Sequence, residues 1–188
     1  MVEIVPYRES WVADFGAIAS RLRAGLGDLA LRIDHIGSTA VPGLAAKDVI
    51  DVQVTVAALT PAVEAAMAAC GYTRRAGPWR DHRPAGAEGV EADWEKWLFE
   101  APQGVRRTNT HVRVAGRANQ RYALLFRDYL RAHPAAAAAY AELKRRLARS
   151  LADPRTYPEV KDPAVDLIYL AAEDWARAIG WQPGPADG

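Results

Sequence analysis

The sequence predicts an α/β (α+β) fold in which a small mixed sheet is flanked by helices and followed by a C-terminal helical segment. Three observations favour this fold class. Apolar residues recur at helical spacing between residues 11 and 26. Residues 50–56 and 109–114 alternate apolar and polar side chains, as strands with one polar face do. From residue 118 onward the apolar residues again follow a helical period.

Length and composition fit one domain. The chain has 188 residues, of which 50% are hydrophobic and 25% are charged, so it is long enough to bury a substantial core. We expect a single domain over residues 1–182, with an α/β core at 1–116 and a helical segment at 117–182. Residues 183–188 are expected to form a flexible tail.

Charge and cysteine content limit the classes of partner. The formal net charge is +1, so a nucleic-acid partner is not expected. Cys70 is the only cysteine, and no stretch reaches the roughly 18 consecutive apolar residues that a membrane helix needs. We therefore expect a cytoplasmic protein with no membrane partner. The sequence leaves the oligomeric state open.

The first half of the chain predicts strands and helices separated by turns. Ser10 is the expected N-cap of the first helix. The expected elements are an extended entry at 2–7, a helix at 10–27, strands at 30–36 and 50–56, a helix at 61–70, a strand at 71–76 and a loop at 77–89. Asp81 and His82 lie in this Gly- and Pro-rich loop, so exposure is expected for both.

The second half predicts a pair of strands and then helices. The expected elements are strands at 94–99 and 109–114, helices at 118–133 and 135–151, a loop that holds Tyr157 and Lys161, and a final helix at 168–179. The Asp153-Pro154 pair is expected to end the second of these helices.

A small-residue turn between two strands carries the strongest chemical signal. Gly37 lets a backbone approach a ligand closely, Ser38 and Thr39 offer hydroxyl groups, and consecutive turn N–H groups form an anion-binding concavity. Asp51 follows on the polar face of the next strand, where its carboxylate could hold a divalent cation against a bound phosphate. Lys47, just before that strand, could reach the same phosphate; the alternative is a solvent-facing lysine.

The spacing of these residues resembles a known pattern. Gly37-Ser38, followed after a spacer by Asp51-Val52-Gln53-Val54, is similar to the signature of the nucleotidyltransferase superfamily. Residues 35–47 (HIGSTAVPGLAAK) more closely resemble the GrpB family, a branch of that superfamily. Further similar segments are at 109–112, 126–134, 140–144 and at Tyr157 with Lys161. The resemblance covers residues 5–178 and implies a nucleotidyltransferase-like mixed sheet and nucleotide chemistry.

One position departs from the superfamily pattern. The second carboxylate falls on Gln53, and an uncharged amide does not hold a second metal ion in a two-metal site. Asp93, Glu95 and Glu100 are the candidates for a third carboxylate, and spacing does not choose among them. The departure leaves open whether the chain catalyses transfer or only binds.

Two further sets of residues are candidates for the same site. The chain has 20 Arg but only 4 Lys, and all four lysines fall in motif segments, so we expect several of them to meet one anionic ligand. Asn109, His111 and Arg113 share one face of their strand. That face is expected to lie beside Asp51, with a solvated sheet face as the alternative.

These observations give one candidate site and three functional hypotheses. Asp51, His111 and Lys96 are the expected catalytic residues, with Asp51 as the ligand of a Mg²⁺ cofactor. The expected phosphate or nucleotide contacts are Gly37, Ser38, Thr39, Lys47, Gln53, Asn109, Arg113, Lys144, Tyr157 and Lys161. The first hypothesis is metal-dependent nucleotidyl transfer. The second is a non-catalytic, regulatory binder of a nucleotide or phosphorylated metabolite, and the third is an RNA-binding module.

Overall fold

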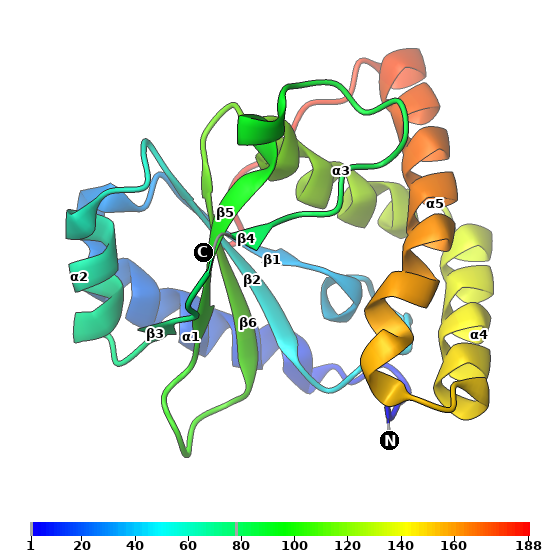
Figure 1. Cartoon of the computed structure of the whole chain (residues 1–188), viewed down its shortest axis with the longest axis horizontal. Coiled ribbons are helices and arrows are strands. Elements are labelled where there is room, and N and C mark those ends of the chain that lie inside the picture. Colours follow the sequence, from blue (N-terminus) through cyan, green and yellow to red (C-terminus); the bar gives the residue numbers. More distant parts are fainter. Residues whose placement is uncertain (1, 78) are drawn as a thin grey trace.

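The computed structural model, which describes residues 2–77 and 79–188, places a twisted sheet between two groups of helices (Figure 1). The strands are β1 (Arg32–Ile36), β2 (Ile50–Val56), β3 (Thr73–Arg74), β4 (Trp79–Arg80), β5 (Glu95–Glu100) and β6 (Thr108–Val114). The helices are α1 (Ser10–Leu26), α2 (Pro61–Ala69), α3 (Ala118–Ala132), α4 (Pro134–Ser150) and α5 (Tyr157–Ile179). The predicted α/β class with a mixed sheet is confirmed.

The sheet has the strand order β1-β2-β6-β5-β3, and β4 pairs with β5 off this path. Most neighbours are antiparallel, but β2 and β6 run parallel. A parallel pair needs a crossover connection, and residues 57–107 provide it with α2, β3, β4 and β5. This crossover brings two polar strand faces, far apart in sequence, to the centre of the sheet.

One face of the sheet packs against α1 and α2. Trp11, Phe15 and Leu22 of α1 are almost fully buried, as their spacing predicts. They join a core with Ile50 and Val52 of β2 and with further apolar residues of α2 and the sheet. On the opposite face of β2, Gln53 and Thr55 are also buried, and the Gln53 amide donates to the Gln120 carbonyl of α3.

The C-terminal helices cover the other face and extend beyond it (Figure 1). Leu124 and Leu125 of α3 are fully buried beneath this layer. Tyr140 of α4 and Val165 of α5 pack with Val41 and Leu44 of the segment between β1 and β2. The helical layer therefore touches the segment that contains the Gly-Ser-Thr turn. No helix among the described residues is long and apolar enough to cross a membrane.

Several local predictions differ from the structure. Ser10 begins α1 and Glu9 occupies the N-cap position, without a side-chain cap hydrogen bond. Tyr157 and Lys161 lie in α5 rather than in a loop. Pro158 suits the first turn of a helix, where no N–H is needed, and α5 continues through Pro163. The Asp153-Pro154 pair is instead followed by a short 3₁₀ turn at Pro154–Thr156, and α5 begins directly after it.

The expected flexible tail is held at its end by the sheet. The backbone N–H of Gly188 donates to the carbonyl of Ile33 at 3.1 Å. Oδ2 of Asp187 accepts a hydrogen bond from the backbone N–H of His35 at 3.0 Å and pairs with Arg127. The last two residues thus form hydrogen bonds with the free edge of β1, although both residues are exposed.

Candidate functional site

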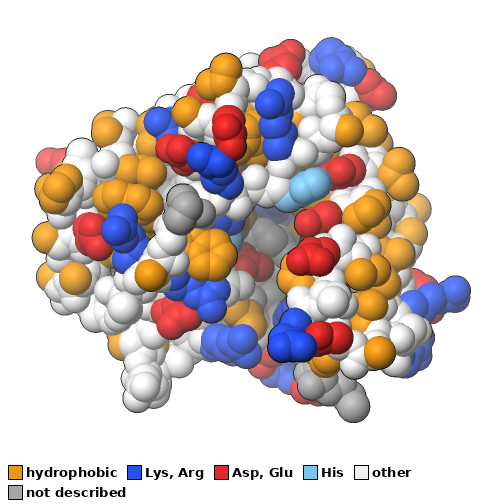
Figure 2. All heavy atoms as spheres, viewed as in Figure 1, with side chains coloured by type: hydrophobic (Ala, Val, Ile, Leu, Met, Phe, Trp, Pro, Cys, Tyr) orange, Lys and Arg blue, Asp and Glu red, His pale blue; other side chains and the backbone are white. Residues whose placement is uncertain are grey.

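A cavity of about 580 Å³ opens between the sheet and the C-terminal helices. Figure 2 shows the hollow near the middle of the molecule, with basic side chains gathered along its lower rim. Eleven of the predicted site residues line it: Gly37, Ser38, Thr39, Lys47, Asp51, Asn109, His111, Arg113, Lys144, Tyr157 and Lys161. The structure therefore brings together residues from β1 through α5.

The Gly-Ser-Thr turn lies directly over Asp51. Gly37 has φ +69° and ψ −168°, a combination that is open almost only to glycine. A β-carbon on Gly37 would lie 3.0 Å from Cβ and Cγ of Asp51 and closer still to the carboxylate. Ser38 then opens a short 3₁₀ turn that ends at Ala40. Glycine is needed here both for its backbone angles and for the space that Asp51 occupies.

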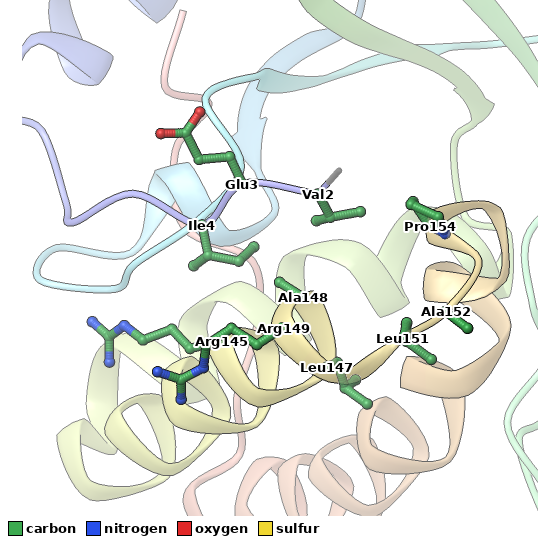
Figure 3. Close-up of a pocket in the computed structure, with 10 residues that line it drawn as sticks. All are labelled: Val2, Glu3, Ile4, Arg145, Leu147, Ala148, Arg149, Leu151, Ala152 and Pro154. Carbon is green, nitrogen blue, oxygen red and sulfur yellow. The ribbon is translucent and has the colours of Figure 1, made fainter.

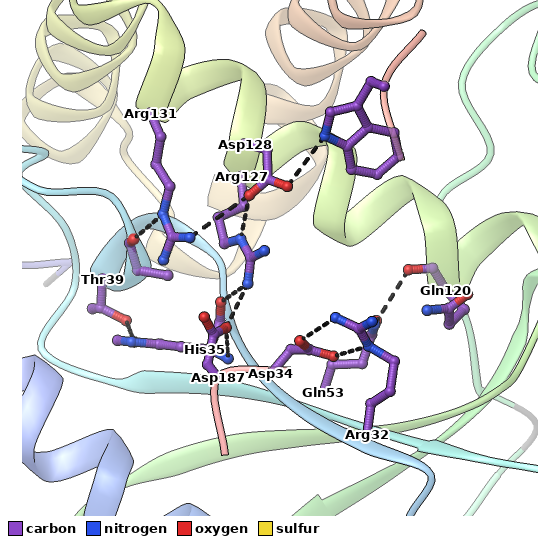
Figure 4. A network of polar contacts seen from close by, with 12 residues as sticks. Arg32, Asp34, His35, Thr39, Gln53, Gln120, Arg127, Asp128, Arg131 and Asp187 are labelled. Atoms are coloured by element: carbon purple, nitrogen blue, oxygen red, sulfur yellow. Dashed lines mark hydrogen bonds and ion pairs between the residues drawn. The ribbon is translucent and has the colours of Figure 1, made fainter. Parts of the chain in front are cut away.

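Arginines of α3 hold the turn in place through hydrogen bonds to backbone carbonyls, in the network that Figure 4 shows. Arg127 donates to the carbonyl of His35 at 3.0 Å, and Arg131 donates to the carbonyl of Ala40 at 2.9 Å. The His35 ring stacks on Phe15 and its Nε2 lies 2.9 Å from the Thr39 hydroxyl. Burial lowers the pKa of His35 to about 4, so the ring is neutral and serves to position the turn.

The parallel pairing of β2 and β6 sets the polar wall of the cavity. Asp51 lies opposite Asn109 and Gln53 lies opposite His111 in the register. The Asn109 amide donates to Oδ1 of Asp51 at 2.8 Å. Burial raises the pKa of Asp51, while Asn109 and nearby cations oppose this shift. The one carboxylate in the wall is thus desolvated and held by a neutral donor rather than by a salt bridge.

His111 lies next to this pair and has an unused ring nitrogen. Its Nδ1 is buried and has no hydrogen-bond partner among the described residues. Burial, together with Lys96 and Arg113, lowers the pKa of His111 well below its usual value. A neutral imidazole at this place can donate or accept one hydrogen bond, or act as a base.

Three of the four lysines converge on the cavity. Nζ of Lys144 donates to the Ser38 hydroxyl at 2.8 Å and to the Ala45 carbonyl at 2.5 Å. Nζ of Lys47 lies 4.0 Å from the ring centroid of Tyr157. Burial, helped by the charge of Lys161, lowers the pKa of Lys144 to about 7. Lys47, Lys144 and Lys161 therefore line one cavity, as the expectation of a shared lysine site requires.

Lys96 and Gln53 do not reach the cavity. Lys96 pairs with Asp81 at 2.5 Å, so its charge is used within the protein. Gln53 is fully buried; its amide donates to the Gln120 carbonyl at 3.2 Å, and its oxygen accepts from Arg113 at 2.7 Å. The predictions of a catalytic Lys96 and of a ligand contact at Gln53 therefore find no support in this geometry.

Asp81 was expected to be exposed and is instead buried. It accepts hydrogen bonds from Lys96, Arg113 and Asn119. The cations of Arg113 and Lys96 outweigh the desolvation and hold its pKa well below the usual range. Asp81 thereby fixes Arg113 at the edge of the cavity. The loop composition did not reveal this role, because the partners lie on β5, β6 and α3.

The three proposed supplementary carboxylates lie elsewhere. Asp93 accepts a hydrogen bond from the backbone N–H of Val90 at 2.9 Å. Glu95 and Glu100 are about half exposed, and they pair with Arg80 and Arg75. None of them lines the cavity. Among the described residues no cluster of three or more His, Cys, Asp or Glu side chains could hold a metal ion.

Two groups of lining residues were missed by the sequence analysis. Arg75 and Arg107 contribute positive charge, and Tyr122, Phe126 and Tyr140 contribute aromatic surface. Tyr122, Phe126 and Tyr140 belong to the apolar stripes of α3 and α4, and the helical period does not show that these stripes also face a cavity. Arg75 and Arg107 sit outside regular periodic patterns, so no local signal marked them.

A larger hollow of about 920 Å³ lies on another side of the molecule. Figure 3 shows it between the N-terminal segment and the end of α4, with Arg145 and Arg149 at its edge. None of the predicted site residues lines it. Both arginines also lie within 4 Å of Glu142, so their charge is partly neutralised within the protein.

The comparisons with known proteins show the family and the fold. A family model described as "GrpB protein" matches residues 1–170. The chain belongs to the GrpB family. The crystal structure of the conserved protein GrpB from Enterococcus faecalis superposes with a TM-score of 0.72 at 28% identity, covering 92% of this chain and 99% of that chain.

The GrpB chain also shares its fold with a larger enzyme. Cid1 poly(U) polymerase, solved in complex with its short product ApU, superposes with a TM-score of 0.52 at 14% identity. The match covers 77% of this chain and 43% of Cid1. At this identity the likeness shows the fold alone. The nucleotidyltransferase-like architecture that the turn and Asp51 predicted is confirmed.

A curated relative of this GrpB chain is named after an enzyme. "Dephospho-CoA kinase" of Mycolicibacterium paratuberculosis is 40% identical over 97% of this chain, which corresponds to 48% of that protein. The chain spans about half the length of this relative and of the next ones it matches. The kinase name thus describes a protein about twice as long.

Proposed function

We propose that this GrpB chain binds a nucleotide or a related phosphorylated small molecule in the cavity over Asp51. One observation carries the proposal: basic side chains without an acidic partner face the cavity. Lys47, Lys144 and Arg107 line it, and none of them pairs with a carboxylate among the described residues. Most other arginines of the chain do have such partners, so the uncompensated charge points to an anionic ligand.

The charge balance of the whole lining supports the same ligand class. Among the described lining residues, six are basic and one, Asp51, is acidic. The Ser38 hydroxyl and the N–H groups of its turn lie at the same wall, where an anion can accept hydrogen bonds from them. Phosphate groups satisfy both kinds of donor.

Unused polar groups and aromatic rings favour a nucleoside attached to the phosphate. The Tyr157 hydroxyl and His111 Nδ1 are buried without hydrogen-bond partners in the described part of the chain. Both residues line the cavity, as do Tyr122, Phe126 and Tyr140. A sugar or base can complete the hydrogen bonds and stack on the rings. The volume of about 580 Å³ lies in the range of small-molecule sites.

Metal-dependent nucleotidyl transfer is the second candidate, favoured by the position of Asp51 beneath the Gly-Ser turn. Mg²⁺ is commonly held by one or two carboxylates together with substrate phosphates, and Asp51 fits the first of these roles. Among the described lining residues Asp51 is the only carboxylate, and Gln53, at the position of the second carboxylate, is an amide bound to Arg113 and Gln120. Transfer chemistry here would depend on Asp51, the phosphates and the basic side chains.

The name of the longer relative guides the choice of probes. Dephospho-CoA contains an adenine nucleotide, so adenine nucleotides come first in the panel. We propose no kinase activity for this chain, since it spans only half of that relative. It also contains no Gly-x-x-x-x-Gly-Lys-Ser/Thr loop, the backbone cradle that many kinases use for ATP.

The experiment is a thermal-shift panel of nucleoside mono-, di- and triphosphates with and without Mg²⁺. A ligand present at a hundred times its Kd adds about 2.7 kcal/mol to the free energy of unfolding, which is roughly 5–10 °C in Tm for a chain of this size. Lys47→Ala and Lys161→Ala should reduce the shift, and the exposed Arg146→Ala should not. A shift that requires Mg²⁺ and Asp51 favours transfer, a metal-independent shift favours binding alone, and no shift contradicts the proposal.

A further inference from the structure

A second hollow adjoins the cavity at the β5–β6 turn. It has a volume of about 300 Å³ and is lined by residues 98–105 and 107–109 together with Arg75. Arg75, Arg107 and Asn109 line both hollows. The two spaces therefore share a wall, formed where β3 ends and β6 begins.

Positive charge continues from the first hollow to the second. Burial lowers the pKa of Lys47, and the positive charges of Lys161 in α5 and of Arg107 lower it further. Lys47, Lys161 and Arg107 all line the cavity, and Arg107 also lines the second hollow. Basic side chains extend along a path rather than around one point.

The second hollow offers donors for another anionic group. Arg107 is exposed and pairs with no carboxylate among the residues that the structure describes. Arg75 is exposed and is bound to Glu100 at 2.7 Å, a surface pair that contributes little stability. Thr108 and Asn109 also line this hollow; the Thr108 hydroxyl is already paired with Thr110, and the Asn109 amide already donates to Asp51. An arginine beside polar groups at this place is suited to a phosphate.

We propose that the ligand carries two separated phosphate groups, one at the Gly-Ser turn and one between Arg75 and Arg107 at the β5–β6 turn. The natural chemical class is a nucleoside 3′,5′-bisphosphate or a larger molecule that contains one. This inference rests on the proposed function, since it names the substrate class of the same site. A contiguous diphosphate occupies only the lysine group and leaves the second hollow unfilled.

Isomeric ligands test the proposal at constant phosphate number. Titration calorimetry compares adenosine 3′,5′-bisphosphate with ADP, and the guanosine, cytidine and uridine forms serve as three further matched pairs. For the cognate base, the bisphosphate should bind at least tenfold tighter than the diphosphate. A 5′-phosphorylated pentanucleotide is titrated in parallel, and tighter binding of it than of every bisphosphate would overturn the small-molecule assignment.

Two variants separate the phosphate positions. Arg107→Gln should weaken the bisphosphate at least tenfold and the diphosphate less than threefold, whereas Lys161→Gln should weaken both to the same degree. Arg107 is exposed, so its variant should fold, and an unchanged Tm verifies this. The exposed Arg146→Gln is the matched control and should change neither affinity.

The failure of this inference differs from the failure of the proposed function. If both isomers of one base bind equally and Arg107→Gln weakens neither or both, the two-phosphate ligand is wrong while a phosphorylated ligand stands. If no member of the four pairs and no triphosphate binds, the proposed function fails together with it.

Discussion

Gly37 lies against the carboxylate of Asp51, so closely that a β-carbon at residue 37 would come within 3.0 Å of Asp51 Cβ and Cγ. Because Asp51 is on a strand and backed by the sheet, it cannot move aside as a flexible surface side chain would. The turn and the strand therefore form one unit, and a change in either alters the wall of the cavity.

Gly37→Ala should reduce the free energy of unfolding by more than the roughly 1–3 kcal/mol that its backbone angles alone cost a non-glycine residue. Gly43→Ala is the matched control, since Gly43 also has a positive φ (+77°) but nothing lies within 4 Å of its β-carbon position. Urea denaturation of both variants measures the difference. Equal losses in the two variants would contradict the contact with Asp51.

Asp51→Asn should stabilise the ligand-free protein at pH 7. Burial raises the pKa of Asp51 above 3.8, so the folded state favours the protonated form. Its contribution to stability is present below pH 3.8 and is lost as pH rises through the folded-state pKa. Asn mimics the neutral acid and removes this loss. Urea denaturation between pH 4 and 8 measures this gain in stability, with the exposed Asp174→Asn as control. If Asp51→Asn is less stable than the wild type at pH 7, the predicted stabilisation is wrong.

Affinity for an anion should fall as pH rises through about 7, the pKa to which burial lowers Lys144. Only the protonated amine carries a charge for the ligand. The charged groups that face Lys144 are Lys161, Asp51 and Arg145. Sulfate is the probe, because its own charge is constant over pH 6–8. The sulfate-induced rise in Tm should decline over this range in the wild type, and Lys144→Met should abolish the decline. A parallel decline in the variant would assign the effect to another group.

Asp81→Asn should reduce the free energy of unfolding by about 3–5 kcal/mol, because it leaves the buried cations of Lys96 and Arg113 without their carboxylate. Asp153→Asn breaks an exposed pair with Arg155 and should change the same quantity far less, because solvent screens exposed ion pairs. Chemical denaturation at pH 7 compares the two. A loss below 1 kcal/mol in Asp81→Asn would show that the buried pair is dispensable.

The parts of the site that follow from short-range patterns were predictable. The alternation around Asp51 and around His111 placed both on polar strand faces, and the Gly-Ser turn marked the edge of the cavity. The contacts that depend on tertiary packing were not predictable. Asp81 lies in a loop, as predicted, but Lys96 of β5 and Arg113 of β6 pair with it there. The same contact holds Lys96 away from the cavity.

Two further differences between prediction and structure have separate causes. The loop around Lys161 was expected to follow the Asp153-Pro154 break, but α5 begins at Tyr157, and Pro158 lies in its first turn, where a proline loses no hydrogen bond. Gln53 matched the position of a superfamily carboxylate, so it was assigned to the ligand. The helix α3 covers that position and supplies the Gln120 carbonyl as its partner. Gln53 and Gln120 are 67 residues apart in the sequence, so no local pattern links them.

The parallel pairing of β2 with β6 has a consequence for how the protein acquires its site. Asp51 meets Asn109 only after a 58-residue separation is closed, and such non-local contacts form slowly during folding. Lys144 and Lys161 emerge later still from a ribosome. A nascent chain therefore has no cavity until nearly all of it has been synthesised, and occupancy by a ligand would report that folding is complete.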